Sequence, residues 1–204
     1  MKKIFLILTL LVFALSCGKK GGNGSTFTLN IVTEPSSIDP QITTDIPGGT
    51  VDELILEGLL RKDKTGKSVA GIAEKWEKSK DGLVWTFHLR DGVKWSNGDP
   101  VTANDFKAGW IRGLNPDTAG SNASMLFVIK NGEKYNAKKV SENEVGIKVI
   151  DDKTLQVARL LCSNFDEDSA ENLIALPETS AVISRSGNGY GKTIHYGNHR
   201  AYSV

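Results

Sequence analysis

The sequence predicts a mixed α/β fold, because segments with the two-residue period of strands alternate with segments that carry helix caps and helical spacing. The strongest strand signal is residues 83–89, where apolar and polar side chains alternate. A hairpin is predicted at residues 145–157, whose two alternating halves flank Asp151, Asp152 and Lys153. No internal repeat competes with this interpretation.

The chain opens with the features of an export signal. Two lysines precede the apolar stretch 4–15, which is shorter than the roughly 20 residues that a membrane-crossing helix needs. We therefore expect residues 1–16 to be a signal peptide. The residues just before Cys17 are similar to a lipobox, and a polar, glycine-rich tether follows over 17–25. We expect Cys17 to be acylated, with ordinary secretion and an incidental cysteine as the alternative.

Two elements are expected between the tether and residue 60. Apolar residues alternate with others along 27–32, which predicts a strand that ends before Pro35. Thr50 and Glu53 form a capping-box pair ahead of apolar residues at helical spacing. We therefore expect a helix from about residue 51 to residue 60.

The middle of the chain has the pattern of strands separated by tight turns. Residues 81–82 and 91–92 are Asp-Gly turn pairs on either side of the strand at 83–89. A further short strand is expected at 93–95, closed by a turn at 97–100. Three consecutive strand-and-turn units indicate an antiparallel section here.

A second capped helix is predicted after these turns. Thr102 and Asp105 repeat the capping pair ahead of an apolar stripe about three turns long, and Asn115 with Pro116 ends it. All four tryptophans fall on the apolar faces of predicted elements, so packing in a core is favoured over a ligand platform. They are Trp76, Trp85, Trp95 and Trp110.

The charge balance and the cysteines limit the class of protein. The chain has 25 basic and 24 acidic side chains, a net charge of +1, without long blocks of either sign. This balance provides no electrostatic footprint for nucleic acid or for an anionic membrane. If Cys17 is acylated, only Cys162 remains, so an apolar core rather than a disulfide must hold the fold.

No residue pattern indicates catalysis or a cofactor. His88 lies on the polar face of a predicted strand, and Cys162 has no clear partner base. His195 and His199 have the spacing of a helical metal site, but the residues between them form helices poorly and supply no carboxylate. We expect a protein that is not an enzyme and uses no cofactor, with a metal site at these two histidines as the alternative.

The segment 71–107 resembles the signature region of the oligopeptide and dipeptide class of bacterial extracellular solute-binding proteins, family 5. Its letters run GIAEKWEKSKDGLVWTFHLRDGVKWSNGDPVTANDFK. Residues 34–40, 57–60 and 115–119 resemble further blocks of the same family in the expected order. The resemblance covers residues 27–157.

This resemblance implies a fold of the type II periplasmic-binding-protein kind, in which two α/β lobes close over a ligand and a further domain is inserted near the start. On that basis residues 26–49 begin lobe I and residues 50–160 form the inserted α/β domain. Residues 161–204 match the family poorly before turning back towards lobe I. We interpret 161–204 as the product of a damaged or misread reading frame followed by truncation.

The function that the resemblance implies is capture of oligopeptides outside the inner membrane and delivery to an ABC permease. The protein would be held in the cell envelope, periplasmic or extracytoplasmic, by its N-terminal lipid anchor. Thr44, Asp45 and Ile46 resemble the strand whose main chain runs along the peptide, and Asn122 resembles a pocket position. The alternatives are a carrier of nickel, haem or oligosaccharide with the same fold, and a truncated, non-functional remnant.

Overall fold

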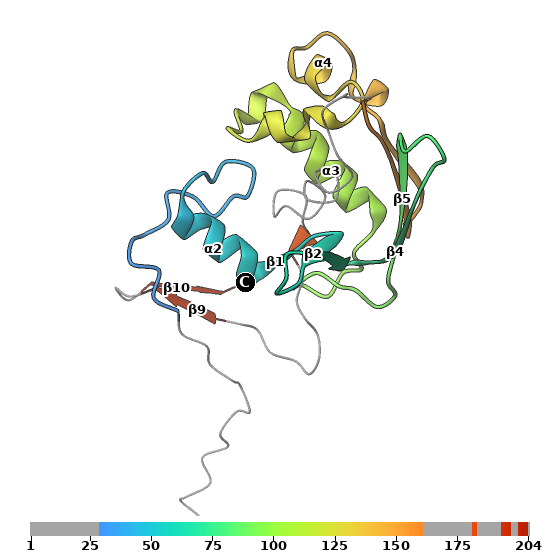
Figure 1. Cartoon of the computed structure of the whole chain (residues 1–204). Helices are drawn as coiled ribbons and strands as arrows, with labels where there is room; N and C mark the ends of the chain where they lie inside the picture. Colours follow the sequence, from blue (N-terminus) through green and yellow to red (C-terminus); the bar gives the residue numbers. More distant parts are fainter. Residues whose placement is uncertain (1–28, 161–180, 183–192, 197–199, 204) are drawn as a thin grey trace, which may run out of the picture.

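A computed structural model describes residues 29–160, 181–182, 193–196 and 200–203 (Figure 1). The main sheet has four antiparallel strands in the order β4-β5-β7-β6. These are β4 (Ala73–Lys78), β5 (Val84–Leu89), β6 (Ile147–Asp151) and β7 (Thr154–Ala158). The predicted strand at 83–89 and the predicted hairpin at 145–157 are therefore confirmed, and their pairing joins distant parts of the sequence.

Alternation along β5 and β7 gives this sheet one apolar face. Trp85 and Phe87 are buried on β5, and they lie opposite Val157 and Leu155 of β7. The rings of Trp85 and Phe87 are stacked with their centroids 6.3 Å apart. Side chains two residues apart lie on the same face of a strand, so the alternating apolar residues form the face of the sheet that packs in the core.

Helix α3 (Ala103–Leu114) supplies the opposing layer of the core. In Figure 1 it lies beside the four-stranded sheet, and Phe106 and Trp110 belong to the same buried cluster as Phe87. The Asp105 carboxylate accepts hydrogen bonds from the backbone N–H and the hydroxyl of Thr102, at 2.7 and 3.0 Å. The predicted start of this helix is confirmed.

A group of short helices follows α3 at the top of Figure 1. They are η1 (Pro116–Thr118), η2 (Ala123–Val128), α4 (Gly132–Asn136) and η3 (Glu142–Glu144). η2 contacts both α3 and α4, and its Leu126 is buried in the common core. This packing holds the segment that contains Asn122 next to α3.

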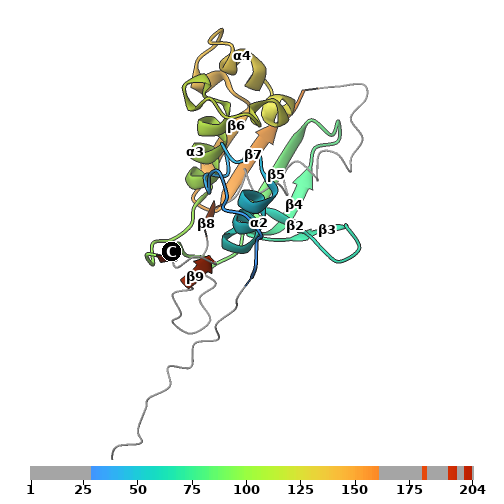
Figure 2. The same cartoon turned by 90° about the vertical axis from the view of Figure 1, so that its left-hand side faces the viewer.

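The remaining elements lie to the left of α3 or below it in Figure 1. Helix α2 lies to the left of α3 in Figure 1 and faces the viewer in Figure 2. The elements are α2 (Ile46–Ile55), β1 (Leu56–Glu57), β2 (Leu60–Lys62), β3 (Ser68–Ala70), β8 (Ala181–Val182), β9 (Thr193–Tyr196) and β10 (Arg200–Ser203). β1 pairs with β8, β2 with β3, and β9 with β10, each antiparallel.

The strand predicted at 27–32 is wrong for the part that the structure describes, because residues 29–32 form no strand. Val32 has a φ of 59°, in the left-handed region, and its side chain is 91% exposed. The Asn30 Oδ1 accepts a hydrogen bond of 2.9 Å from the Val32 N–H. This local turn takes the backbone out of the extended conformation that a strand needs.

The helix predicted at 51–60 is displaced. α2 runs from Ile46 to Ile55, and its N-cap is Asp45 rather than Thr50. Thr50 lies inside the helix, where its hydroxyl donates to the Ile46 carbonyl at 2.8 Å. Asp45 followed by Pro47 is the stronger start signal, because proline suits the first turn of a helix and an aspartate caps it.

The short strand predicted at 93–95 is also wrong. Only an isolated bridge joins Lys94 to Pro100, around a turn in which Gly98 has a φ of 95°. Proline has no N–H with which to extend the ladder. The predicted core role of the tryptophans is confirmed, since Trp85 and Trp110 are buried. Trp76 and Trp95 are partly buried against the same cluster.

Other expectations fall outside the described residues. The predicted signal peptide, Cys17 and its tether lie in residues 1–28, which the structure does not describe, and Cys162 is likewise outside the described residues. No helix in the part of the chain that the structure describes combines the length and the apolar character needed to span a bilayer.

Candidate functional site

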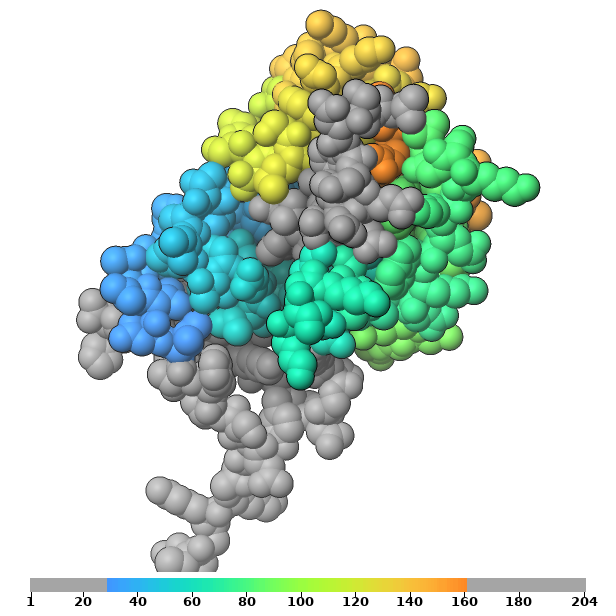
Figure 3. All heavy atoms as spheres, viewed as in Figure 1, coloured from blue at the N-terminus to red at the C-terminus, as the bar shows by residue number. Residues whose placement is uncertain are grey.

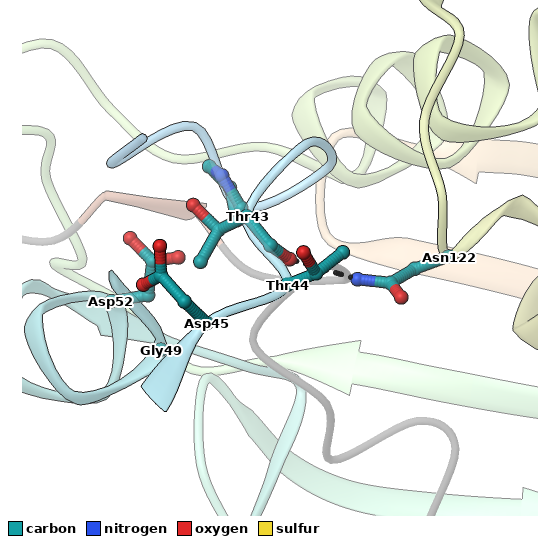
Figure 4. A pocket seen from close by; sticks show the side chains of 7 residues that line it. Thr43, Thr44, Asp45, Gly49, Asp52 and Asn122 are labelled. Carbon is teal, nitrogen blue, oxygen red and sulfur yellow. Dashed lines mark hydrogen bonds between the residues drawn. The ribbon is translucent and has the colours of Figure 1, made fainter. Parts of the chain in front are cut away.

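A pocket of about 230 Å³ opens where the loop before α2 meets the segment before η2. It is lined by Pro40, Thr43, Thr44, Asp45, Gly49, Asp52 and Asn122 (Figure 4). In the space-filling view, the blue segment around the start of α2 touches the yellow segment that follows α3 (Figure 3). Sites for drug-sized ligands usually measure roughly 300–1,000 Å³, so this pocket matches one side chain better than a whole ligand.

Asp45 organises the loop wall of the pocket. Its Oδ1 accepts a hydrogen bond of 2.7 Å from the Gly48 N–H, and its Oδ2 accepts one of 2.8 Å from the Ser36 N–H. Hydrogen bonds from Ser36 and then from Gly48 hold the pKa of the Asp45 carboxyl below its usual value. The carboxylate is therefore charged at neutral pH, while its backbone, at φ −95° and ψ 155°, is extended.

Glycine at position 48 lets the first turn of α2 approach this loop. A Cβ at Gly48 would lie 2.4 Å from the Thr43 Cγ2 and 2.6 Å from the Ser37 carbonyl oxygen. A Cβ at Gly49, one residue later, would meet nothing within 4 Å. The two adjacent glycines therefore have different roles, because only the first is required by close packing.

A side chain from distant sequence completes the pocket. The Asn122 Nδ2 donates a hydrogen bond of 3.0 Å to the Thr43 carbonyl, drawn as the dashed line in Figure 4. The Thr43 hydroxyl in turn donates to the Ser37 carbonyl at 2.8 Å. Asp52, on α2, is 2% exposed and forms part of the pocket wall.

An arginine of α3 holds the start of the same loop. The Arg112 guanidinium donates from Nη1 to the Asp39 Oδ1 at 2.8 Å and from Nη2 to the Asp39 Oδ2, and it also contacts the Gln41 Oε1. The Gln41 Nε2 donates to the Gly109 carbonyl at 2.6 Å. The Arg112 hydrogen bonds hold the pKa of the Asp39 carboxyl below its usual value, against the opposing effect of burial.

The structure brings together Thr44, Asp45 and Asn122 of the predicted site residues, since all three line the pocket. Ile46 does not line it and is 85% exposed. The strand expected at Thr44, Asp45 and Ile46 is wrong, because Asp45 is the N-cap of α2 and Ile46 is its first residue. Thr44 makes no hydrogen bond to any other residue that the structure describes.

Four of the lining residues were not predicted from the sequence: Pro40, Thr43, Gly49 and Asp52. Gly49 and Asp52 follow Asp45 by four and seven positions, which is the spacing of one helix face. A helix started at Asp45 instead of Thr50 would have indicated both. Pro40 and Thr43 carry no such signal, because their position depends on contacts with α3 and Asn122.

The two histidines considered as a metal site fall only partly within the described residues. His195 lies in strand β9, and His199 lies outside the described residues. Across residues 29–160 and the three short described strands, no group of three or more His, Cys, Asp or Glu residues is placed to hold a metal ion.

Comparisons with known proteins agree on one family. The model of the bacterial extracellular solute-binding proteins, family 5 (middle part), matches residues 67–189, more than half of the chain. The oligopeptide-binding protein OppA of Bacillus subtilis is 42% identical over 163 residues, which cover 76% of this chain and 30% of that protein. The periplasmic oligopeptide-binding protein OppA of Haemophilus influenzae is 36% identical over 178 residues, covering 86% and 33%.

Solved structures show the same relationship in three dimensions. The substrate-binding domain of an oligopeptide ABC transporter from Bacillus anthracis superposes with a TM-score of 0.71 at 37% identity, covering 78% of this chain and 30% of that one. Listeria monocytogenes OppA bound to peptide gives a TM-score of 0.71 at 34% identity, covering 78% and 31%.

These matches confirm the mixed α/β class and its likeness to part of a type II periplasmic binding protein. The chain spans about a third of the length of the relatives that it matches. The match at residues 67–189 nevertheless covers the capped helix α3 and the whole four-stranded sheet. The chain belongs to family 5 of the bacterial extracellular solute-binding proteins.

Proposed function

We propose that this chain is part of the substrate-binding component of an ABC importer, and that it captures oligopeptides outside the inner membrane for delivery to the permease. The names of the similar proteins from Bacillus subtilis and Haemophilus influenzae, both oligopeptide-binding, support this proposal. The role is capture without covalent change, so the protein is not an enzyme. Its division into the start of lobe I at 26–49 and an inserted domain at 50–160 belongs to the same proposal.

The observation that carries the proposal is the free main chain of Thr44 beside the pocket. Thr44 is exposed, has no hydrogen-bonding partner among the described residues, and precedes a residue with extended backbone. A peptide can add to such an edge as a strand, with its backbone N–H and C=O groups paired to the protein main chain. Main-chain pairing tolerates varied ligand side chains, which suits a carrier of many peptides.

The pocket provides room for one ligand side chain next to this edge. Its volume of about 230 Å³ and its polar walls at Thr43, Asp45 and Asn122 accommodate a hydrated side chain. Thr44, Asp45 and Ile46 are proposed to contribute main-chain contacts, and Asn122 a pocket contact. Ile46 can contribute through its backbone even though its side chain points to solvent.

Acylation of Cys17 is proposed to anchor the protein to the membrane and to keep it in the cell envelope near its permease. The apolar stretch 4–15 and the glycine-rich tether 17–25 support this. Metabolic labelling with an alkyne fatty acid should mark the wild-type protein and not a Cys17→Ser variant. Equal labelling of the two would refute the anchor.

The peptide site is tested by calorimetric titration of the purified chain with a mixture of peptides of three to five residues. We expect saturable binding that is lost when the same peptides carry N-methyl groups on their backbone amides, because methylation removes the donors that strand addition uses. Peptides with unmodified backbones and methylated side chains are the matched control. Equal binding of backbone-methylated peptides would refute main-chain pairing, and absence of binding by every peptide would refute peptide capture by this part of the component.

A further inference from the structure

We propose that Arg112 is a positioning residue for the peptide site: it fixes the loop 36–45 against helix α3 and so sets the width of the pocket. The expected effect on peptide binding rests on the proposed function, whereas the expected effect on the loop rests on the contacts of Arg112 alone. Arg112 does not line the pocket, so it acts through the loop and not through contact with a ligand.

The Arg112 guanidinium makes a fork of contacts with Asp39 and Gln41, which precede it by more than 70 positions in the sequence. Its two terminal nitrogens bind the two carboxylate oxygens of Asp39, and Nη1 also reaches Gln41. Bidentate pairs between a guanidinium and a carboxylate are stronger and more directional than single hydrogen bonds between neutral groups. The fork therefore defines both the distance and the orientation of the loop relative to α3.

Gln41 extends this connection into the protein interior. It is 7% exposed, and its Nε2 donates to the Gly109 carbonyl of α3 at 2.6 Å. A Cβ at Gly120, after the end of α3, would lie 2.5 Å from the Gln41 carbonyl oxygen. Glycine at position 120 is therefore required for the close approach of the Gln41 backbone.

Asp39 transmits its position directly to the pocket wall. Its carbonyl accepts hydrogen bonds from the backbone N–H groups of Ile42 and Thr43, at 3.0 and 2.8 Å. This turn carries the chain from the Arg112 fork to Thr43 and Thr44, which line the pocket. A displacement of Asp39 therefore displaces the edge proposed to pair with peptide.

Apolar burial of the loop isoleucines does not replace the fork, and the Gln41 hydrogen bond to Gly109 fixes only one further point of the loop. The two isoleucines of the loop, Ile38 and Ile42, are 44% and 42% exposed. Across the pocket, the Asn122 Nδ2 donates a hydrogen bond of 3.0 Å to the Thr43 carbonyl. Loss of Arg112 should consequently loosen the loop while leaving the core of sheet and α3 intact.

The test compares Arg112→Met with wild type in two measurements on the purified chain. Arg112→Met keeps a long, unbranched side chain without its donors. We expect amide hydrogen exchange at Ile42 and Thr43 to accelerate about tenfold or more, with exchange in β5 unchanged, since local opening no longer breaks charge-assisted bonds. The dissociation constant for the mixture of three-to-five-residue peptides should rise by about tenfold as well.

Two further variants separate positioning from charge. Lys107→Met removes a cation from the same helix away from the loop contacts and should match wild type in both measurements. Arg112→Lys retains the charge but cannot form the bidentate fork, so it should remain impaired in both.

The outcomes distinguish this inference from the proposed function. If the wild-type chain binds no peptide, peptide capture by this part of the component is refuted, while the exchange comparison still decides whether Arg112 holds the loop. Unchanged exchange at Ile42 and Thr43 in Arg112→Met would overturn the inference. Faster exchange throughout β5 would also overturn it, because Arg112 would then support global stability. Faster local exchange with an unchanged peptide affinity would overturn the positioning role.

Discussion

The core of sheet and α3, between residues 73 and 158, and the pocket segment, residues 29–55, are held in different ways. In the core, apolar side chains at regular intervals meet across the sheet and α3, as with Phe87 and Trp110. In the pocket segment, the loop carries exposed isoleucines. It is held by hydrogen bonds that Arg112 and Asn122 donate and by one that the Asp45 carboxylate accepts.

This difference indicates what each region is suited to do. Apolar burial is non-directional and collectively large, so it produces a stable platform. Directional polar contacts are fewer and individually modest, but they fix a loop precisely while leaving its backbone open to solvent. The proposed peptide edge at Thr44 lies in the second region, and the platform that carries it is the first.

The largest expected effect comes from opening the core. Phe87→Ala, at a residue with 0% exposure, should lower the free energy of unfolding by about 3–5 kcal/mol. Ile150→Ala, at a residue with 46% exposure on β6 of the same sheet, should change it by less than about 0.5 kcal/mol. Urea unfolding followed by tryptophan fluorescence measures both, and similar losses in the two variants would contradict the assignment of faces.

The next largest effect is expected from a comparison of the two adjacent glycines of α2, Gly48 and Gly49. Gly48→Ala should destabilise the protein by about 1–3 kcal/mol, because its Cβ would overlap Thr43 and the Ser37 carbonyl. Gly49→Ala meets open space and should stabilise it by about 0.5–1 kcal/mol through reduced backbone entropy of the unfolded chain. Thermal unfolding of the pair provides the measurement. A loss in both variants would contradict the described approach of α2 to the loop.

A smaller effect separates a true cap from an apparent one. Thr102→Ala should cost about 1 kcal/mol, because Thr102 is the N-cap of α3 and contacts Asp105. Thr50→Ala should change stability by only a few tenths of a kcal/mol, because Thr50 lies inside α2 and alanine favours a helix interior. Equal costs in urea unfolding would indicate that α2 starts at Thr50 after all.

The smallest expected effect is the pH dependence of the stability that the Arg112–Asp39 ion pair contributes. Arg112 lowers the pKa of Asp39 below its usual value of 3.8 in the folded state, so the unfolded state binds a proton more readily. The ion pair therefore contributes stability above pH 3.8. This contribution is lost as the pH falls through the pKa that Asp39 has in the folded state, which is below 3.8. For a partly exposed pair it amounts to less than about 1 kcal/mol.

Comparison with Asp39→Asn isolates this contribution from the other carboxylates that titrate in the same range. The difference in unfolding free energy between wild type and Asp39→Asn should be constant near neutral pH and should shrink in acid. Urea unfolding at a series of pH values measures it. A difference that grows as the pH falls would contradict the sign of the shift.

Much of the core could be predicted because its signals are local. The alternation along β5, the capping pair at Thr102 and the turn at 151–153 each specify a conformation within a few neighbouring residues. The pocket segment was predicted less well, since Asp45 competes with Thr50 as a helix start and Asn30 turns the chain at Val32. The choice between these local signals depended on contacts with distant residues.

For the candidate site, resemblance indicated Thr44, Asp45 and Asn122, whereas Pro40, Thr43 and Asp52 emerged only from the fold. By itself, the sequence determined the family, the apolar faces of β5 and α3 and the capped start of α3, because residue spacing and local hydrogen bonding specify them. The tertiary structure alone decided that Arg112 meets Asp39 and that Asn122 meets Thr43. Those pairs are separated by more than 70 residues, and no local preference brings them together; the tertiary packing of the loop against α3 and the segment after it does.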